Sequence, residues 1–449
     1  MSAGYDGSIV NKRELTRLVK ETNVRFLRMQ FVDIFGITKN VVIPVAELEH
    51  ALDGQVTFDG GSIAGFVRSE EVDMMLKPDL STFTVYPWTL EGETEGRLIC
   101  DIVQADGEPF EGCPRTTLKR SIADAREMGF TLSTCVEAEF YLFQRDDQGR
   151  PTVGASERGS YFDFSPADVG ENARRHMVAT LEAMGFHVAS AHHEHGPGQH
   201  EIDFKSADML TTADNVVTLR NVVRHIAMER DLHATFMPKP LGDGAGSALH
   251  IEFTLREGER NAFADESGDR GLSPTALFFI GGLLAHAPAI TAIANPTVNS
   301  YKRLVPFWDA PVLTVWSERS ANSMIRIPSG RGDATSIELR SPDSSCNPYL
   351  TLAVVLAAGL DGIRNESLPG QPFSGSSYDL SERQRSERGI RELPFSLREA
   401  LVELDRDPVV RGALGDHIYH AFREAKAAEY ERYRRAVHPW ELDAYLTLH

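Results

Sequence analysis

Cysteine is scarce in this sequence, and its few cysteines are widely separated. Four occur among 449 residues, and none of them belongs to a CxxC pair. This pattern argues against a disulfide-stabilised secreted fold and against a cysteine-ligated zinc site. The first residues, MSAGYDGSIVNKRELTRLV, also lack the basic and then apolar regions of a secretion signal. Both absences predict a cytoplasmic protein with reduced thiols.

Positive charge is also in short supply, because 65 acidic residues outnumber 46 basic ones and leave a formal net charge of −19. Phosphate contacts need clustered Lys and Arg, so nucleic acid is not the expected partner. The longest apolar run, ALFFIGGLLAHAPAITAIA, is interrupted by His286 and Pro288 and has no basic flanks. It predicts a buried helix and no membrane span. The acidic balance suits a soluble enzyme, including one that gathers divalent cations.

Two units are expected along the chain. In the first hundred residues, VRFLRMQFVDIFG ends at Gly36 and TKNVVIPV follows, which is typical of a strand hairpin. The turn-rich segment QADGEPFEGCPR marks a boundary near residue 104, and beyond it strands alternate with amphipathic helices. The prediction is an α+β protein. It has a small sheet domain at residues 1–103 and a large domain at 104–449, whose mostly antiparallel sheet is packed by helices.

Acidic side chains occupy one face of a predicted strand in the large domain. In LSTCVEAEFYL, alternate residues from Leu132 to Leu142 are mostly apolar and share one face, whereas Glu137 and Glu139 share the other. Two carboxylates two residues apart are spaced by about 7 Å along a strand. A cation between them relieves their repulsion. A solvated sheet face is the alternative for one such strand alone.

The same alternation recurs in three more segments. HEIDFK places Glu201 and Asp203 on one face, and ALHIEFTL does the same for His250, Glu252 and Thr254. SIELR adds Glu338 and Arg340. Four such strands predict a polar funnel lined by carboxylates. Oxygen ligands with few imidazoles suit Mg²⁺ or Mn²⁺ better than zinc, and such sites usually serve phosphate chemistry.

The common phosphate-binding loops are missing. The sequence contains no GxxxxGK[ST], and no GxGxxG stands between a strand and a helix. An ATP site in this chain is therefore neither of the P-loop nor of the Rossmann type.

Several segments, taken in order, resemble the type I glutamine synthetases of bacteria and archaea. The resemblance extends from about residue 10 to the carboxyl-terminal HPWELDAYL. The segments that carry it are FDGGSIAGF, VEAEFYLF, HHEHGPGQHEIDF, FMPKPLGDGAGSALH, NPTVNSYKRLVPFWDAP and IELRSPDSSCNPYL. NSYKRLVP and GQHEIDF are highly specific in this combination.

The resemblance implies an amino-terminal β-grasp domain and a catalytic domain whose antiparallel sheet forms a funnel. Twelve subunits form two hexameric rings, with active sites between adjacent subunits. ATP phosphorylates the side chain of L-glutamate, and ammonia then displaces phosphate from γ-glutamyl phosphate. Two or three Mg²⁺ or Mn²⁺ ions serve each site. By motif, Glu139, Glu194 and Glu201 hold one of them, and Glu137, His250 and Glu338 hold another.

The resemblance also implies roles for the remaining site residues. Arg303 and Arg340 bind the glutamate carboxylate and the transferring phosphoryl group, for which a guanidinium fork is suited. Gly246, with His250, contacts glutamate. Thr254 and Arg326 lie on the nucleotide side. Asp59 from the neighbouring subunit takes a proton from ammonium, and Asp309 acts from a flap that closes over the site.

The sequence departs from the family around this metal site. The flap reads PFWDAP where PGYEAP is usual, so Asp309 replaces a glutamate, and Ala245 stands where an asparagine contacts substrate. On the nucleotide side, Ala321 and Ser336 replace basic residues and Ala189 replaces an acid. Each lost charge-assisted contact weakens triphosphate binding by about 1.5–3 kcal/mol.

Three functions remain open on the sequence alone. The first is a glutamate–ammonia ligase of nitrogen metabolism. The second is a γ-glutamyl-amine ligase that accepts a larger amine such as a polyamine, ethanolamine or methylamine. The third is a metal-binding paralogue without activity that joins or regulates an active one.

Overall fold

The amino-terminal sheet is built from five strands. The computed structural model describes residues 11–66, 72–90, 92–153, 158–306, 310–320 and 322–448. The strand order is β2-β1-β5-β4-β3, and only the β1–β5 pair is parallel. The elements are α1 (Lys12–Glu21), β1 (Val24–Val32), β2 (Thr38–Pro44), α2 (Leu48–Leu52), β3 (Val56–Asp59), β4 (Asp73–Leu90) and β5 (Glu93–Gln104). The predicted β1–β2 hairpin is confirmed.

The turn of that hairpin contacts the large domain. Gly36 has a positive φ of 81°, and a Cβ there would lie 3.0 Å from the Cα of Asn347. Asn347 in turn donates hydrogen bonds from Nδ2 to the backbone oxygens of Asp33 (3.1 Å) and Ile34 (3.3 Å). Glycine therefore meets both the conformation and the close approach that this contact requires.

The large domain is organised around a second sheet, with strand order β13-β14-β15-β11-β6-β8-β7 and antiparallel pairing except between β13 and β14. Its long central strands are β6 (Thr131–Gln144) and β11 (Leu249–Glu257). The others are β7 (Val188–His193), β8 (Gln199–Phe204), β9 (Ala207–Asp208), β10 (Leu232–Thr235), β12 (Arg260–Asn261), β13 (Trp316–Ser317), β14 (Ile325–Arg326) and β15 (Ile337–Leu339). The sheet confirms the α+β class and the mostly antiparallel pairing.

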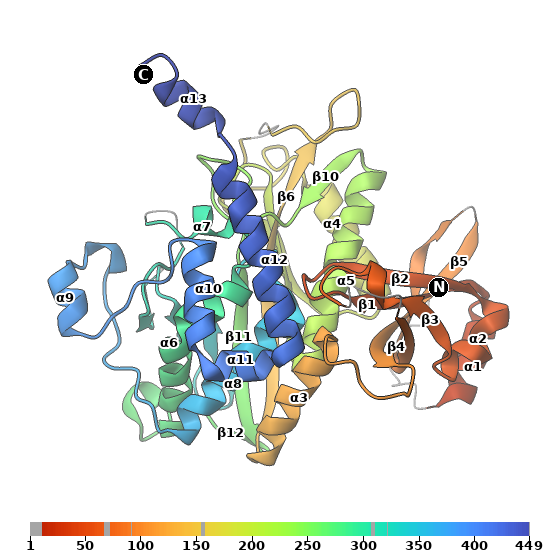
Figure 1. Ribbon diagram of the computed structural model, residues 1–449, viewed down its shortest axis with the longest axis horizontal. Helices are drawn as coiled ribbons and strands as arrows, with labels where there is room; N and C mark the ends of the chain where they lie inside the picture. The colour runs from red at the N-terminus through yellow and green to blue at the C-terminus, as the bar shows by residue number, and fades with distance from the viewer. Residues whose placement is uncertain are drawn as a thin grey trace.

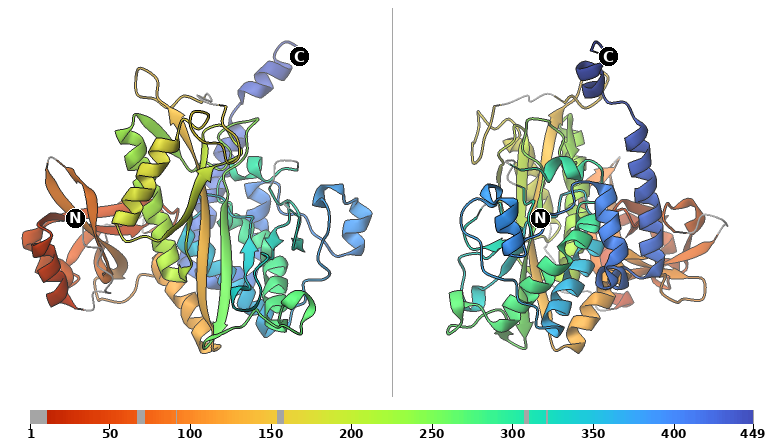
Figure 2. Two further views of the ribbon diagram at one scale, coloured as in Figure 1. Left: turned by 180° about the vertical axis from the view of Figure 1, so that it is seen from behind. Right: turned by 60° about the vertical axis from the view of Figure 1, so that its left-hand side comes forward.

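Helices cover one face of this sheet. Figures 1 and 2 show α6, α8, α10, α11 and α12 together on that side, which leaves the other face of the central strands accessible for a site. The helices are α3 (Pro114–Glu127), α4 (Glu171–Ala183), α5 (Met209–Glu229), α6 (Pro274–Ala294), α7 (Ser300–Arg303), α8 (Pro348–Arg364), α9 (Glu382–Glu387), α10 (Leu397–Arg406), α11 (Pro408–Leu414), α12 (Asp416–Arg435) and α13 (Pro439–Tyr445).

Alternation along β6 separates the core from the open face. Val136, Ala138 and Phe140 are at most 2% exposed and belong to the hydrophobic core. Glu137 and Glu139 point to the opposite face, because successive side chains of a strand alternate. The face assignment made from the sequence is therefore confirmed for this strand.

The long apolar run forms α6. It is the one described helix with the length and composition to cross a membrane, but 78% of its apolar window is buried inside the protein. It packs chiefly against α8 and α10. The interpretation of this run as a core helix is confirmed.

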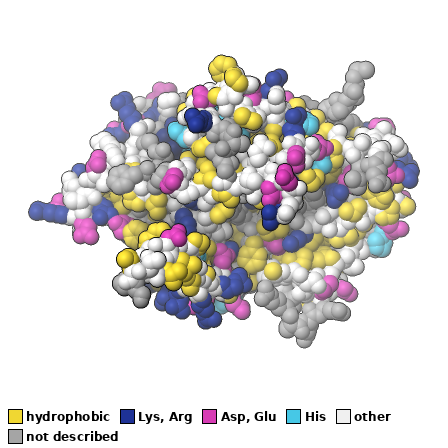
Figure 3. Space-filling view, turned by 90° about the horizontal axis from the view of Figure 1, so that it is seen from above, with side chains coloured by type: hydrophobic (Ala, Val, Ile, Leu, Met, Phe, Trp, Pro, Cys, Tyr) yellow, Lys and Arg dark blue, Asp and Glu magenta, His cyan; other side chains and the backbone are white. Residues whose placement is uncertain are grey.

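The carboxyl-terminal helix α13 extends away from the rest of the molecule (Figure 1). On the face seen from above in Figure 3, acidic and basic side chains are interspersed among apolar and other polar ones.

Candidate active site

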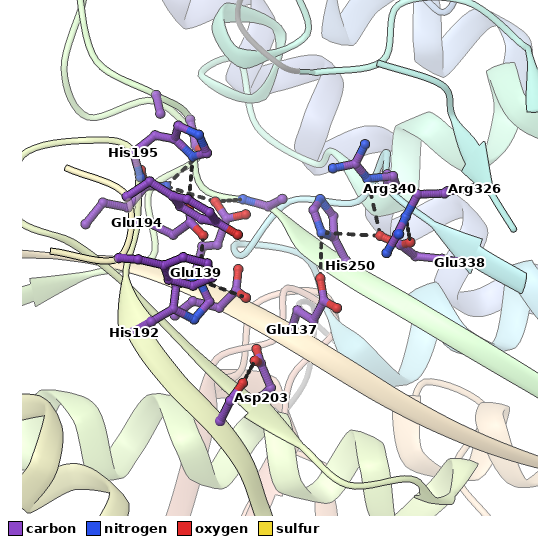
Figure 4. A pocket seen from close by; sticks show the side chains of 18 of the residues that line it. Glu137, Glu139, His192, Glu194, His195, Asp203, His250, Arg326, Glu338 and Arg340 are labelled. Carbon is purple, nitrogen blue, oxygen red and sulfur yellow. Dashed lines mark hydrogen bonds and ion pairs between the residues drawn. The ribbon is translucent and has the colours of Figure 1, made fainter. Parts of the chain in front are cut away.

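A cavity of about 690 Å³ opens on the helix-free face of the central sheet. Its walls come from β6, β7, β8, β11 and β15 and from the segments around residues 245 and 319 (Figure 4). Ten residues predicted from the sequence line it: Glu137, Glu139, Glu194, Glu201, Gly246, His250, Arg303, Arg326, Glu338 and Arg340.

One group of ligand-type side chains spans three adjacent strands. Glu137 on β6 lies opposite His250 on β11, and Glu338 lies on β15 beyond it. The Nδ1 atom of His250 is 3.0 Å from Oε2 of Glu137 and 3.6 Å from Oε1 of Glu338 (Figure 4). One ligand atom from each of the three lies within 4.8 Å of the others. These are the residues predicted together for one metal ion.

Two arginines lie beside this group. Arg326 forms an ion pair through Nε with Glu338, and Nε of Arg340 is 3.2 Å from the other oxygen of that carboxylate. Burial tends to raise the pKa of Glu137, but the hydrogen bond and charge of His250, with both arginines, lower it below its usual value. Glu137 is therefore ionised and ready to bind a cation at neutral pH.

A second group consists of buried carboxylates. Glu139 on β6 faces Glu201 on β8 across the sheet, and Glu194 lies just before the turn that leads into β8. All three are at most 8% exposed. Burial, reinforced by the charge of Glu194 although opposed by His250, raises the pKa of Glu139 to about 7. Burial and the neighbouring carboxylates raise the pKa of Glu201 far above its usual range.

Two further residues lie in this group, and the sequence analysis did not predict either of them as a metal ligand. His192, Glu201 and Asp203 each offer an atom within 4.8 Å of the others. His192 Nε2 is 3.0 Å from Glu194 and 3.7 Å from Glu201. The sequence did indicate Asp203, because it shares the strand face of Glu201. For His192 the sequence offered no indication beyond its place in a histidine-rich loop.

This donor set fits a hard divalent cation. Carboxylate oxygens dominate both groups, each has one imidazole, and no described cysteine lines the cavity. Buried acids whose pKa is raised by their neighbours need a compensating positive charge once they ionise. Mg²⁺ and Mn²⁺ favour such oxygen-rich sites.

A buried tyrosine and glutamine connect the second group to the loop at residues 244–248. Gln199 Nε2 donates to Oε2 of Glu139 (2.9 Å) and to the backbone oxygen of Gly246 (3.0 Å). The hydroxyl of Tyr141 donates to the backbone oxygen of Ala245 (2.7 Å). A Cβ at Gly196 would lie 1.9 Å from that hydroxyl, so the turn requires glycine there. Sequence reasoning did not identify this connection.

Arg303 forms the inner wall of the cavity. It is 3% exposed and donates to the backbone oxygens of Ser341 (2.8 Å) and Arg340 (3.0 Å). Burial lowers its pKa, although arginine stays charged. A Cβ at Gly246 would lie 2.6 Å from Cγ of Arg303, which explains why glycine occupies that position.

Other predicted residues lie elsewhere. Asp59 is at the end of β3 in the amino-terminal sheet, away from the cavity lining of its own chain, and hydrogen bonds from Ser62 and Gly61 lower its pKa. Thr254 lies on β11, outside the cavity lining. Asp309 and Ala321 fall outside the described residues.

A second cavity of about 530 Å³ adjoins the first. The two share Glu318, Arg319 and Ser320, and the smaller one also contains Arg270. Together they provide an acidic compartment and an adjoining compartment with two arginines.

Comparison with protein families identifies both parts of the chain. The model described as "Glutamine synthetase, beta-Grasp domain" matches residues 23–105. The model described as "Glutamine synthetase, catalytic domain" matches residues 111–445.

Individual relatives match over almost the whole length. The chain is 51% identical to a glutamine synthetase of Thermus thermophilus and 48% identical to one of Clostridium saccharobutylicum, covering 97% of this chain and 98% of each relative. Among solved structures, one titled GmaS/ADP complex superposes with a TM-score of 0.87 at 31% identity, covering 96% of this chain and 99% of that one. Plasmodium falciparum glutamine synthetase superposes with a TM-score of 0.88 at 24% identity, covering 98% and 99%, and supports the fold.

Proposed function

Because the chain belongs to the glutamine synthetase family, we propose that it is an ATP-dependent ligase that forms a γ-glutamyl amide from L-glutamate and ammonia. The observation that carries this function is one cavity in which two carboxylate-rich groups meet four arginines. Charge of both signs is needed there, because the reaction brings a triphosphate and a dicarboxylic amino acid together.

Ammonia is the acceptor that the relatives favour. Those with 47–51% identity over nearly the full length carry the name glutamine synthetase. A larger amine is the second candidate, motivated by the replaced flap sequence PFWDAP. The inactive paralogue is the least supported of the three, since the acidic groups and four arginines are all present in the cavity.

We assign the divalent ions to the two carboxylate-rich groups. Glu137, His250 and Glu338 would hold one, and Glu139, Glu194 and Glu201 would hold another, with His192 and Asp203 as neighbouring donors. Bound there, Mg²⁺ or Mn²⁺ would neutralise the charge of the phosphates. Mg²⁺ is the more abundant candidate for ATP-dependent chemistry, and both ions fit the oxygen donors.

The residues of the chain account for binding and orientation. Arg303 and Arg340 offer guanidinium groups on one side of the cavity, suited to the carboxylate of glutamate and to the phosphoryl group that moves onto its side chain. Gly246, which packs closely against the side chain of Arg303, lies in the same lining and would contact substrate through its backbone. Ammonia then attacks γ-glutamyl phosphate, and phosphate leaves. Asp59 of a neighbouring subunit and Asp309 would accept the proton from ammonium.

The nucleotide would extend into the adjoining cavity of about 530 Å³. Arg326 lines the catalytic cavity, Arg319 lines both cavities, and Arg270 lines the adjoining one, where its Nε is 3.3 Å from Glu318. These arginines offer a substitute for the basic residues replaced by Ala321 and Ser336. Thr254 is retained as a predicted nucleotide contact.

We further propose assembly into two hexameric rings in the cytoplasm. The supporting observation is the exposed apolar side chains at the carboxyl-terminal helix, where Trp440 on α13 is 68% exposed and Leu446 directly after it is 72% exposed. An exposed apolar surface of this kind is typical of a protein–protein interface.

The decisive experiment measures phosphate release from ATP in the presence of L-glutamate and Mg²⁺. Ammonium is compared with methylamine, ethanolamine and putrescine as acceptors. We expect turnover with ammonium at the highest kcat/KM, and Arg340→Met should reduce it at least about a hundredfold, because an interaction made in the transition state is lost. A strong preference for one amine would replace ammonia as the acceptor. Absence of both phosphate release and ATP binding would refute both ligase functions.

A further inference from the structure

A third cavity, of about 460 Å³, separates the two domains and shares no lining residue with the catalytic cavity. On one side lie β4 and β5 of the amino-terminal sheet. On the other lie the start of α5 and the segments that connect α4 to β7 and β8 to β9. Its lining is largely polar and includes Ser81, Thr82, Thr84, Thr211 and Asn215.

Arg97 on β5 lines this cavity with a buried guanidinium group whose hydrogen bonds are incomplete. It is only 4% exposed, and its Nε and Nη1 atoms have no hydrogen-bond partner among the described residues. The guanidinium group is always charged in proteins. A buried cation without oxygen partners carries a large desolvation cost, so an anion or an anion-bound state is expected to relieve it.

The other buried arginine of this cavity is fully engaged. Arg115 donates to Asp214 (3.0 and 2.9 Å), to Asp79 (2.8 Å) and to Asp101 (3.1 Å). The remaining acid of the lining, Asp208, accepts hydrogen bonds from backbone nitrogens at the start of α5. The acids of the wall are therefore already occupied by other donors.

Lys205 is the second cation without an acidic partner. It follows Phe204, the last residue of β8, and it forms no ion pair with any carboxylate in the described part of the chain. Within that part, Arg97 and Lys205 are thus two positive groups that line one polar cavity without a carboxylate of their own. His187 lies beside Lys205, and its backbone oxygen accepts a hydrogen bond from the backbone nitrogen of Lys205 (2.9 Å).

We propose that this cavity between the domains binds a small oxyanion, a phosphate or a dicarboxylate, with Arg97 and Lys205 as its charged ligands. Both classes offer the oxygens that a guanidinium fork recognises. A bound anion bridges β5 of the amino-terminal sheet to the end of β8, the strand that carries Glu201 and Asp203. It therefore holds the two domains together and lies within one strand length of the catalytic groups.

The test measures binding and not activity, so its outcome is independent of the proposed reaction. Thermal unfolding and titration calorimetry are recorded with inorganic phosphate and with succinate, against sodium chloride at equal ionic strength. All proteins carry Arg340→Met, which removes a competing arginine of the catalytic cavity. Arg97→Met and Lys205→Met are compared with Arg126→Met, which removes an exposed arginine of α3 outside this cavity.

We expect at least one of the two anions to raise the midpoint of unfolding in the Arg340→Met protein and in its Arg126→Met derivative. Arg97→Met should weaken that binding at least about tenfold and should unfold at the same or a higher temperature without anion, because a desolvated charge is gone. Phosphate binding alone identifies a phosphoryl ligand, and succinate binding alone identifies a carboxylate ligand.

Three results would overturn the proposal. The first is an anion-induced shift that survives in Arg97→Met, and the second is the lack of a shift with either anion in the parent protein. The third is a lower unfolding temperature for Arg97→Met without any anion binding, which would make Arg97 a countercharge for Asp79, Asp101 and Asp214 only.

Discussion

At the scale of single residues, the catalytic cavity depends on uncharged groups that orient the charged ones. The Nε2 atom of Gln199 donates hydrogen bonds to the carboxylate of Glu139 and to the backbone oxygen of Gly246. Its Oε1 atom accepts a hydrogen bond from the backbone nitrogen of Gly196 (2.9 Å). Tyr141 adds a hydrogen bond to Ala245. A metal-binding carboxylate and the substrate loop are thereby fixed relative to each other.

Tyr141→Phe removes one hydroxyl and keeps the ring. The lost hydrogen bond to Ala245 should lower stability by about 1–2 kcal/mol. It should also raise KM for glutamate roughly five- to tenfold with a smaller change in kcat, because the loop is less well positioned. Steady-state kinetics and urea unfolding measure the two effects.

Tyr301→Phe is the matched control, since the buried hydroxyl of Tyr301 has no hydrogen-bond partner among the described residues. It should leave KM unchanged and keep or increase stability. Equal effects of the two substitutions would contradict the role assigned to Tyr141.

At the scale of secondary-structure elements, His286 connects three helices. It lies within α6, and its Nδ1 is 2.7 Å from Asp407 at the start of α11 while its Nε2 is 3.0 Å from Asp361 on α8. Burial opposes protonation, but both hydrogen bonds to these aspartates raise the pKa of His286 above its usual value.

The stabilisation by His286 should depend on pH. A raised pKa means that the contribution is complete below the unfolded value of about 6.5 and is lost as pH rises through the folded value. His286→Gln should therefore lower stability by about 1.5–3 kcal/mol near pH 6, and by less toward pH 9. Chemical unfolding across this pH range measures the difference. His420→Gln, at an exposed position of α12, should show no such trend.

The carboxyl-terminal helix is an element that needs a partner. Trp440 on α13 and the flanking residues Val437, Leu446 and Leu448 are each at least 68% exposed, and α13 projects from the body of the subunit (Figure 2). Substituting Trp440→Lys together with Leu446→Lys should reduce the assembly to smaller species, as measured by light scattering after gel filtration. Asp443→Lys on the same helix changes charge without removing apolar area. A double variant with the native mass would contradict the proposed contact.

At the scale of the whole molecule, divalent ions should control stability in a pH-dependent way. Without metal, burial of the acidic groups raises the pKa of Glu139 to about 7 and that of Glu201 further. The folded chain then holds protons that the unfolded chain releases near pH 4.3, so the stability of the metal-free protein falls as pH rises from about 4.3 through 7.

Bound Mg²⁺ or Mn²⁺ replaces those protons. The midpoint of thermal unfolding should therefore rise on adding metal, and the rise should be larger at pH 8 than at pH 6. Calorimetry in two buffers of different ionisation enthalpy should detect proton release on binding. Glu201→Gln should reduce that release, whereas Glu257→Gln, at an exposed position of β11, should not. A metal effect that is constant over this pH range would contradict the assignment.

Local pattern was sufficient to predict much of this protein. Alternation along β6 and β11 placed Glu137, Glu139 and His250 on one face, because the side-chain period of a strand is two residues. The apolar run of α6 predicted a buried helix for a similarly local reason. The α+β class followed from the order of elements, and the identity of the family followed from a series of ordered motifs along nearly the entire chain.

The tertiary structure decided what no local pattern specifies. Only the pairing of β6 with β8 brings Glu139 opposite Glu201, and only folding places His192 and Asp203 beside them. The lack of a hydrogen-bond partner for Nε and Nη1 of Arg97 among the described residues likewise depends on how segments of both domains, distant in sequence, line one cavity. Sequence periodicity determines which way a side chain points, whereas burial and neighbouring charges, which set its chemistry, come from segments that meet only in the folded chain.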